Sequence, residues 1–480
     1  MSNEKTANKK HTVGAENMDN VGAYNDEEKL KELFRDNPEA MCAYNILKYT
    51  DKSVFLTGKA GTGKSTFIKL AKLLFPNVSV IAPTGLAATN VSGSTIHSAY
   101  NLPFGFMLPQ NPKLAEILFS KDDEFYITMG IELIIIDEVS MVNCAMLDCL
   151  DLILQKICKN EKPFGGKKIL FVGDPFQLPP ILDPEARKLL NGNYSNEHFF
   201  ESEAFQEIDP IKIELKIPYR QSDNLFLTCL NNIRSYKSAP ESIDLLNKYC
   251  CSNGMTLNKM TNKNSIVLTY KNETSNQINK GNLSKISGNV LTFIAEEKGE
   301  FDWAGVQVES RLELKVGARI MITKNNSDGL YANGTLGYIN NFLNDKIIVI
   351  IDDGRKIEIE PEKWTKYRKG NFKINGKWKS EYIEIGSMTQ YPIKLAWAIT
   401  VHKSQGLTFD NVYLLNESHA FAAGQIYVAL SRCRSLEGLK IYKKLCSQDI
   451  KVDRNILKFY NSVVAEKRVG AIMRSISQEL

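Results

Sequence analysis

The chain has 480 residues, and its 60 Lys and Arg against 55 Asp and Glu leave a formal net charge of only +5. Hydrophobic residues make up 43% and charged residues 24%, which is typical of a folded globular protein and excludes a largely disordered one. The mild basic excess permits a nucleic-acid partner without requiring one. The nine cysteines include no C-x-x-C pair, so we expect reduced thiols and no structural zinc.

The length predicts about three domains of ordinary size. No apolar run is long enough to span a bilayer, so we expect no membrane partner. The N-terminal residues are polar and carry acidic side chains, which argues against a signal or transit peptide and favours a cytoplasmic location.

A phosphate-loop motif lies at Gly58–Ser65 and matches G-x-x-x-x-G-K-[ST] at every fixed position. An apolar strand is expected before it, at Ser53–Thr57, and a helix after it, at Thr66–Leu74. This order directs backbone N–H groups and the positive end of a helix at one point, which favours phosphate binding.

The motif therefore predicts ATP and magnesium as ligands. Lys64 supplies a mobile charge for the β- and γ-phosphates, and the Ser65 hydroxyl can ligate Mg²⁺. The expected nucleotide contacts are Gly58, Ala60, Gly61, Thr62, Gly63, Lys64, Ser65 and Thr66.

Strands and helices alternate in the first half of the chain. Strands are expected at Val78–Ala82, Ile131–Ile136 and Lys168–Val172, with a helix at Met141–Cys158. This alternation predicts a doubly wound α/β domain over 26–210, with its ligand at the carboxyl ends of the strands. Residues 1–25 are expected to be a disordered tail, and 101–128 an irregular insertion.

The second half predicts another α/β domain, formed by 211–340 and 394–450. Its expected elements include a strand at Ser265–Thr269 and a helix at Gly424–Arg432. Short β-like runs separated by hairpin signals interrupt it, which predicts a small antiparallel barrel over 341–393. Residues 451–480 are expected to form a helical tail.

Acidic and amide side chains follow two of the buried strands. Asp137 and Glu138 end one strand, where Asp137 is expected to hold Mg²⁺ and Glu138 to orient and deprotonate the attacking water. Gln177 follows the next strand and can bond the γ-phosphate or its water. Arg220 and Arg432 are, by pattern alone, surface charges or helix caps.

The ordered set of motifs resembles the Pif family of superfamily-one helicases, within the RecD-like group. The matching segments are Gly58–Ser65, Ala82–Ala88, Gly93–Ser98, Asp137–Met141, Pro163–Gly166, Gly173–Pro180, Tyr219–Gln221, Thr400–Gly406 and Tyr427–Arg432.

This resemblance implies two RecA-like phosphate-loop domains that clasp ATP between them. Lys64, Glu138 and Gln177 would act from the first domain, while Arg220 and Arg432 would enter as arginine fingers. Gly406 would contact the nucleotide as well. The segment 101–128 matches the family's wedge, and the barrel its Src-homology-type insertion.

The resemblance also implies a single-stranded DNA path across both domains. The expected contacts are Pro83, Thr84, Gly85, Thr95 and His97 from the first domain and Asn272, Thr400, His402, Lys403 and Ser404 from the second. One feature departs from the family, because Met41 stands where a glutamine that reads adenine is expected.

The predicted function is an ATP-driven DNA helicase that translocates 5′→3′ on single strands, acts on forked or structured DNA and works as a monomer. Two alternatives share these motifs: a nucleic-acid-remodelling ATPase that does not separate strands, and an RNA-directed helicase. A small-molecule kinase is disfavoured, because it would not need a second α/β half with its own arginines.

Overall fold

The computed structural model describes residues 31–479, apart from 101, 103–104, 113, 115–129, 220–222, 253–264, 302, 304–305, 307, 327–329, 375–376 and the side chains of 366–383. The expected N-terminal tail, most of the predicted wedge and Arg220 therefore lie outside the described residues. In the described part, no helix combines the length and the apolar character needed to cross a membrane.

The first domain contains a six-stranded parallel sheet in the order β3-β2-β4-β5-β1-β6. Its strands are β1 (Val54–Gly58), β2 (Val78–Ala82), β3 (Ser94–Thr95), β4 (Leu133–Ile136), β5 (Lys168–Val172) and β6 (Ile211–Leu215). The central strands β1 and β4 are buried along their whole length, as parallel strands covered on both faces must be. Because β6 pairs with β1, the first domain extends beyond the expected boundary at residue 210.

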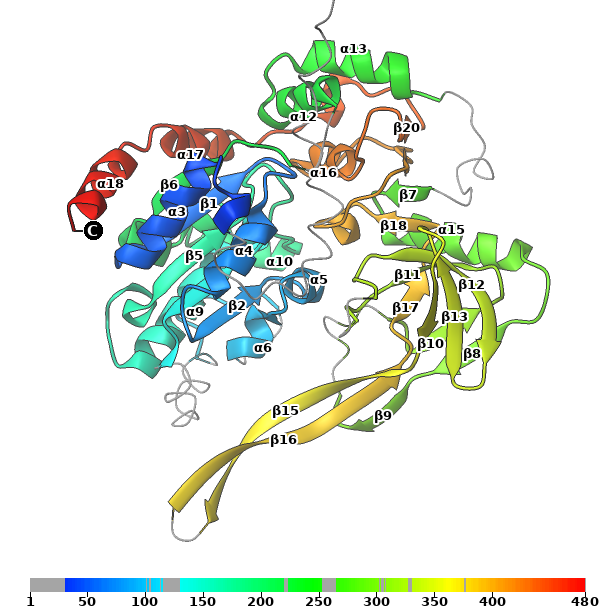
Figure 1. Ribbon diagram of the computed structural model, residues 1–480, viewed down its shortest axis with the longest axis horizontal. Helices are drawn as coiled ribbons and strands as arrows, with labels where there is room; N and C mark the ends of the chain where they lie inside the picture. Colours follow the sequence, from blue (N-terminus) through cyan, green and yellow to red (C-terminus); the bar gives the residue numbers. More distant parts are fainter. Residues whose placement is uncertain are drawn as a thin grey trace, which may run out of the picture.

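Helices and 3₁₀ turns surround this sheet (Figure 1). The helices are α3 (Pro38–Tyr49), α4 (Lys64–Lys72), α5 (Gly85–Asn90), α6 (Ile96–Tyr100), α9 (Cys144–Cys158), α10 (Pro184–Asn191) and α11 (Glu203–Ile208). The 3₁₀ turns are η2 (Val139–Met141), η3 (Pro163–Gly166) and η4 (Phe199–Glu201). Asn37 caps the start of α3 by accepting a hydrogen bond from the Ala40 N–H.

The second domain has a four-stranded parallel sheet in the order β18-β7-β19-β20. The strands are β7 (Ile266–Thr269), β18 (Ala398–Thr400), β19 (Val412–Leu414) and β20 (Leu439–Ile441). Its helices and turns are α12 (Asn224–Ser235), α13 (Ala239–Cys250), α15 (Asn272–Lys285), η5 (His402–Ser404), α16 (Gln425–Ser431) and η6 (Ser447–Asp449). A second α/β domain was therefore predictable, although it is smaller than the first.

The antiparallel insertion differs from the predicted barrel. It contains a five-stranded sheet in the order β14-β13-β12-β11-β17, a two-stranded β8–β10 pair and a three-stranded β15-β16-β9 sheet. The strands are β8 (Leu291–Ile294), β9 (Glu296–Gly299), β10 (Arg311–Leu314), β11 (Arg319–Ile322), β12 (Leu336–Leu343), β13 (Lys346–Ile351), β14 (Lys356–Ile359), β15 (Glu362–Ile374), β16 (Lys377–Gln390) and β17 (Ile393–Leu395).

A closed barrel over 341–393 is thus not confirmed. The sheet begins earlier, at β11, and β15 and β16 leave it as a long hairpin that projects from the body of the molecule (Figure 1). The hairpin expected at Asp352-Asp353-Gly354 is confirmed between β13 and β14, but the turn expected at Lys369-Gly370-Asn371 is wrong, because these residues lie inside β15. Turn residues alone do not determine how far two strands extend.

The C-terminal segment is helical and returns to the first domain (Figure 1). It forms α17 (Arg454–Val464) and α18 (Arg468–Glu479). Phe459 of α17 stacks on Phe200 with ring centroids 4.3 Å apart, and α18 packs beside α3. The chain therefore crosses between the two domains a second time, immediately before α17.

Candidate functional site: a phosphate loop at the seam between two domains

The phosphate loop connects β1 to α4 as the sequence predicts. Gly61 and Gly63 have φ angles of 79° and 90°, a left-handed conformation that glycine adopts without steric cost. The helix α4 begins at Lys64, so its N-terminal N–H groups point into the loop. Ser65 is exposed at this helix start.

The Lys64 ammonium group folds onto this loop. Its Nζ donates to the carbonyl oxygen of Gly58 at 2.6 Å and to that of Lys59 at 3.1 Å. Burial lowers the pKa of Lys64, and the charges of Asp174 and Glu138 only partly oppose that effect. A phosphate brought to this point would add the negative charge that favours the ammonium form.

Asp137 and Glu138 end β4 beside this lysine. Burial raises the pKa of Asp137 to about 8, and the neighbouring Glu138 carboxylate adds to the shift. Glu138 has a φ of 48°, an unusual value for a residue with a side chain and one that often marks functional sites. Ser65 follows Lys64 at the start of α4, and carboxyl and hydroxyl oxygens are the kind of donor that Mg²⁺ prefers.

The second domain closes over these carboxylates through Gln405. Its side-chain amide donates to Glu138 at 3.1 Å and to the Gln177 side-chain oxygen at 3.2 Å. Gln177 is therefore buried at the seam, next to the carboxylate expected to activate water. The adjacent Gly406, with a φ of 82°, faces Asn90 of the first domain.

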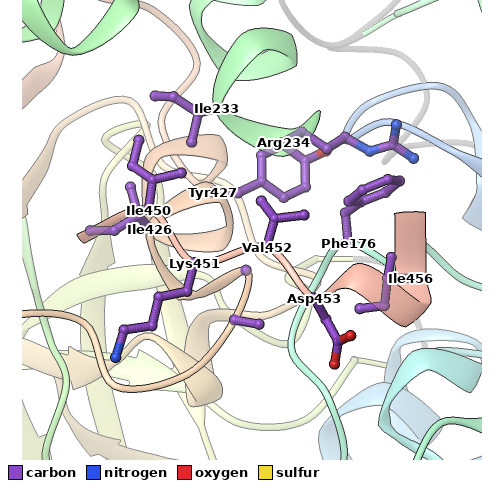
Figure 2. Close-up of a pocket in the computed structure, with 12 residues that line it drawn as sticks. Phe176, Ile233, Arg234, Ile426, Tyr427, Ile450, Lys451, Val452, Asp453 and Ile456 are labelled. Atoms are coloured by element: carbon purple, nitrogen blue, oxygen red, sulfur yellow. The ribbon is translucent and has the colours of Figure 1, made fainter. Parts of the chain in front are cut away.

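A second set of contacts across the seam centres on Asp174, which follows β5. Arg234 of α12 donates to both carboxylate oxygens, and the Tyr427 hydroxyl of α16 donates to one of them at 3.0 Å. Figure 2 shows Arg234 and Tyr427 beside Phe176, over which the guanidinium lies at 4.3 Å. The Ala60 N–H of the phosphate loop in turn donates to the Tyr427 hydroxyl at 3.1 Å.

Sequence reasoning missed these four seam residues, Asp174, Arg234, Gln405 and Tyr427. Three of them lie inside the quoted motifs, so their position next to assigned residues was an available signal. Arg234 lies in an ordinary amphipathic helix, and nothing in its neighbourhood distinguishes it. Burial acts against its charge, but Asp174 outweighs that effect and raises the pKa of Arg234.

Arg432 does not occupy the place expected of an arginine finger. Its side chain is 2% exposed, and its guanidinium donates to the carbonyl oxygens of Val428, Ser404 and Leu407 within the second domain. These bonds join the end of α16 to the loop after β18, which carries Gln405. In this structure Arg432 therefore positions that loop.

The segment that precedes Arg220 lies over the phosphate loop. The Tyr219 N–H donates to the Gly61 carbonyl at 2.8 Å, and the Tyr219 hydroxyl accepts from the Asn37 side-chain amide at 3.3 Å. Met41, which stands where the family resemblance leads us to expect a glutamine, packs against the core of the first domain.

The first-domain residues expected at DNA lie at the carboxyl ends of the paired strands β2 and β3 and at the starts of α5 and α6. Thr84 caps α5 by accepting from the Ala87 N–H, and Pro83 and His97 line the same cavity of about 260 Å³. Burial lowers the pKa of His97, so a neutral ring is expected at neutral pH, suited to a sugar or base rather than to a phosphate charge. Gly85 and Thr95 are half-buried beside them.

The second-domain residues expected at DNA divide into two groups. Asn272, at the start of α15, and Lys403 are exposed, and His402 is half-buried next to Phe421. Thr400 and Ser404 are buried, and their hydroxyls bond the Lys403 N–H and the Val401 carbonyl. Contact of Thr400 and Ser404 with DNA stays a prediction, and in this structure their hydroxyls shape the loop that presents Lys403.

The phosphate loop of one α/β domain is covered by side chains of a second α/β domain. This arrangement defines a phosphate-loop NTPase with two RecA-like domains. Comparison with known families agrees. The model of PIF1-like helicases matches residues 39–239, and that of the UvrD-like helicase C-terminal domain matches 395–436.

Individual proteins give the same result. The chain is 33% identical over 449 residues to the ATP-dependent DNA helicase Pif1 of Campylobacter jejuni, covering 86% of this chain and 95% of the relative. It spans 61% of human ATP-dependent DNA helicase PIF1, at 29% identity. A structure of Bacteroides sp. Pif1 with ADP-AlF4 superimposes with a TM-score of 0.75 at 34% identity, covering 89% and 97% of the two chains.

The chain belongs to the PIF1-like helicase family. It is accordingly an ATP-hydrolysing helicase, and the resemblance found in its motifs is confirmed.

Proposed function

We propose that this chain is an ATP-dependent DNA helicase that moves 5′→3′ along single-stranded DNA and unwinds forked or structured duplexes. The observation that carries the proposal is the seam itself, where Gln405 joins the carboxylate Glu138 to Gln177 across the two domains. A nucleotide held at such a seam couples its hydrolysis to the relative motion of the domains.

The roles of the seam residues follow from their chemistry. Lys64 and the loop N–H groups bind and orient the phosphates, and Glu138 takes a proton from the attacking water that Gln177 positions. Ser65 and Asp137 would hold Mg²⁺, which neutralises charge that develops on the phosphates. Arg220 would stabilise this developing charge as an arginine finger. Arg432 would do the same once bound nucleotide releases its guanidinium from the backbone carbonyls that hold it here.

DNA would cross the edge where the loops after β2 and β3 meet those of the second domain. This edge is continuous, because the Asn325 amide donates to the Thr89 carbonyl at 3.0 Å across the domains. Lys403 and Lys394 are close enough to oppose each other's charge, and burial together with Lys403 lowers the pKa of Lys394 to about 8. A phosphate backbone would relieve this repulsion, so binding should weaken steeply with salt.

The test is an unwinding assay that compares duplexes with a 5′ tail, a 3′ tail and no tail, with DNA and RNA single strands as ATPase stimulators. We expect ATP-dependent strand release from the 5′-tailed duplex alone and stronger stimulation by DNA. ATP hydrolysis without strand release would favour a remodelling ATPase, and preferential stimulation by RNA would favour an RNA-directed enzyme. Concentration dependence of the unwinding rate tests whether the monomer acts alone.

A further inference from the structure

Tyr427 contacts the phosphate loop from the opposite domain. It lies on α16, is 3% exposed, and its hydroxyl is within hydrogen-bond distance of two first-domain groups. The Ala60 N–H donates to it at 3.1 Å, and it donates its single proton to Asp174 at 3.0 Å. The direction of both bonds is fixed, because a carboxylate only accepts and an amide N–H only donates.

The surroundings hold this hydroxyl in place. Asp174 also accepts a bidentate pair from Arg234, so its carboxylate cannot turn away from the seam without breaking buried ionic bonds. Gly424, at the start of α16, lies so close to the first domain that a Cβ there would meet the Phe176 carbonyl oxygen at 2.3 Å. The helix is therefore seated against the backbone that leads to Gln177.

The same short helix is connected to the loop that seals the catalytic carboxylate. Arg432, directly after α16, binds the carbonyls of Ser404 and Leu407, and Gln405 between them bonds Glu138 and Gln177. A movement of the phosphate loop at Ala60 is therefore passed to α16 through the Tyr427 hydroxyl. It is passed on from α16 to the loop that carries Gln405 through the Arg432 guanidinium.

We propose that Tyr427 is a positioning residue that couples the phosphate loop to the closing of the second domain over Glu138 and Gln177. The inference rests on the proposed function, and it adds a residue whose effect is on turnover rather than on nucleotide binding. The hydroxyl accepts from the Ala60 amide, whereas Lys64 lies on the Gly58 and Lys59 carbonyls, so loss of the hydroxyl leaves Lys64 in place.

The test is Tyr427→Phe, which removes only the hydroxyl and keeps the ring. A matched control is Tyr460→Phe, because the Tyr460 hydroxyl bonds Glu214, a neighbour of Arg234 in the same cluster, and does not touch the phosphate loop. For both variants, kcat and KM of the DNA-stimulated ATPase, the equilibrium affinity for a fluorescent ATP analogue and the melting temperature are measured.

Tyr427→Phe should lower kcat by about 10- to 100-fold, the range expected for a lost hydrogen bond to a charged group. Its KM and nucleotide affinity should stay within about threefold of wild type, and Tyr460→Phe should keep wild-type kcat. Unchanged kcat in Tyr427→Phe overturns the proposal, as does an equal loss of kcat and melting temperature in both variants. Absence of DNA-stimulated hydrolysis in the wild type would instead refute the proposed function.

Discussion

At the scale of single residues, opposite charges meet at the seam in buried pairs. Arg234 faces Asp174 with side-chain exposures of 2% and 0%, and Lys64 is close enough to Glu138 and Asp174 for their charges to act on it. Removing one partner of such a pair leaves an uncompensated buried charge, which costs more than the pair itself contributes. Of these pairs, only Arg234 with Asp174 joins the two domains, because Lys64, Glu138 and Asp174 all belong to the first domain; opening the seam would break that pair.

Replacing Lys64 by Ala should abolish DNA-stimulated ATP hydrolysis, because it removes the ammonium group that lies on the loop carbonyls of Gly58 and Lys59 and is expected to bind the phosphates. We expect a loss of at least about 10²-fold in kcat/KM, measured by phosphate release. Lys69→Ala is the matched control, since Lys69 lies on the same helix and is exposed. Full activity in Lys64→Ala would refute the assigned nucleotide site.

Replacing Arg432 by Ala should destabilise the protein as well as slow turnover. The carbonyl oxygens of Val428 in α16 and of Ser404 and Leu407 in the loop would each lose a bond from the guanidinium, for a cost of about 2 to 4 kcal/mol in the free energy of unfolding. Urea denaturation measures that cost beside the steady-state ATPase. Unchanged stability together with a loss of turnover of about 10³-fold would instead indicate that Arg432 acts only as an arginine finger.

Several residue-level assignments were accessible from the sequence and others were not. A phosphate loop is local, so its pattern determined Lys64 and Ser65, and Asp137-Glu138 followed from the end of a buried strand. Arg234 was not accessible, because its role depends on a carboxylate 60 positions earlier in the chain. The burial of Arg432, Thr400 and Ser404 was not accessible either, because a motif does not reveal whether a polar side chain is buried.

At the scale of elements, α17 and α18 tie the end of the chain to the first domain. Glu466 accepts from the Arg468 guanidinium at 2.7 Å, and Arg468 also contacts Asp209, in the turn before β6. Burial acts to raise the pKa of Glu466, but the hydrogen bonds and charge of Arg468 outweigh it and lower the pKa to about 2. We call this set of bonds, Glu466 with Arg468 and Arg468 with Asp209, the C-terminal clasp. It holds α18 in the place where it packs beside α3.

The lowered pKa predicts a pH-dependent clasp. Because the carboxylate is favoured in the folded state, its stabilisation is present above the unfolded pKa, near 4.5, and is lost as pH falls toward 2. Glu466→Gln should lower the melting temperature at neutral pH, and its difference from wild type should shrink between about pH 6 and about pH 3. The exposed Glu437→Gln is the control, and a difference that is constant over this range would contradict the clasp.

In the antiparallel insertion, the sequence predicts individual hairpins but not the pairing of distant strands. Turn residues such as Asp353-Gly354 predicted hairpins correctly, because those residues favour the backbone conformations of tight turns. The pairing of β11 with β17 joins residues about 70 positions apart, and no local pattern records such a register. The sequence therefore predicted strands but not the sheet that they form.

At the scale of the whole molecule, the chain passes from the first α/β domain to the second between β6 and α12 and returns to the first between η6 and α17. The doubly wound fold and the order of the motifs were predictable, because parallel strands and their helices have strong periodic patterns. How the domains meet was not predictable, since it depends on side chains such as Tyr427 and Gln405 that become neighbours only after folding.

The most direct test of this account is a structure of the protein with ADP, aluminium fluoride, Mg²⁺ and single-stranded DNA. We expect the phosphoryl analogue to contact Lys64 from the first domain and at least one side chain from the second, with Gln405 and Tyr427 still at the seam. An analogue held by the first domain alone, with the second domain separated from it, would contradict the central claim.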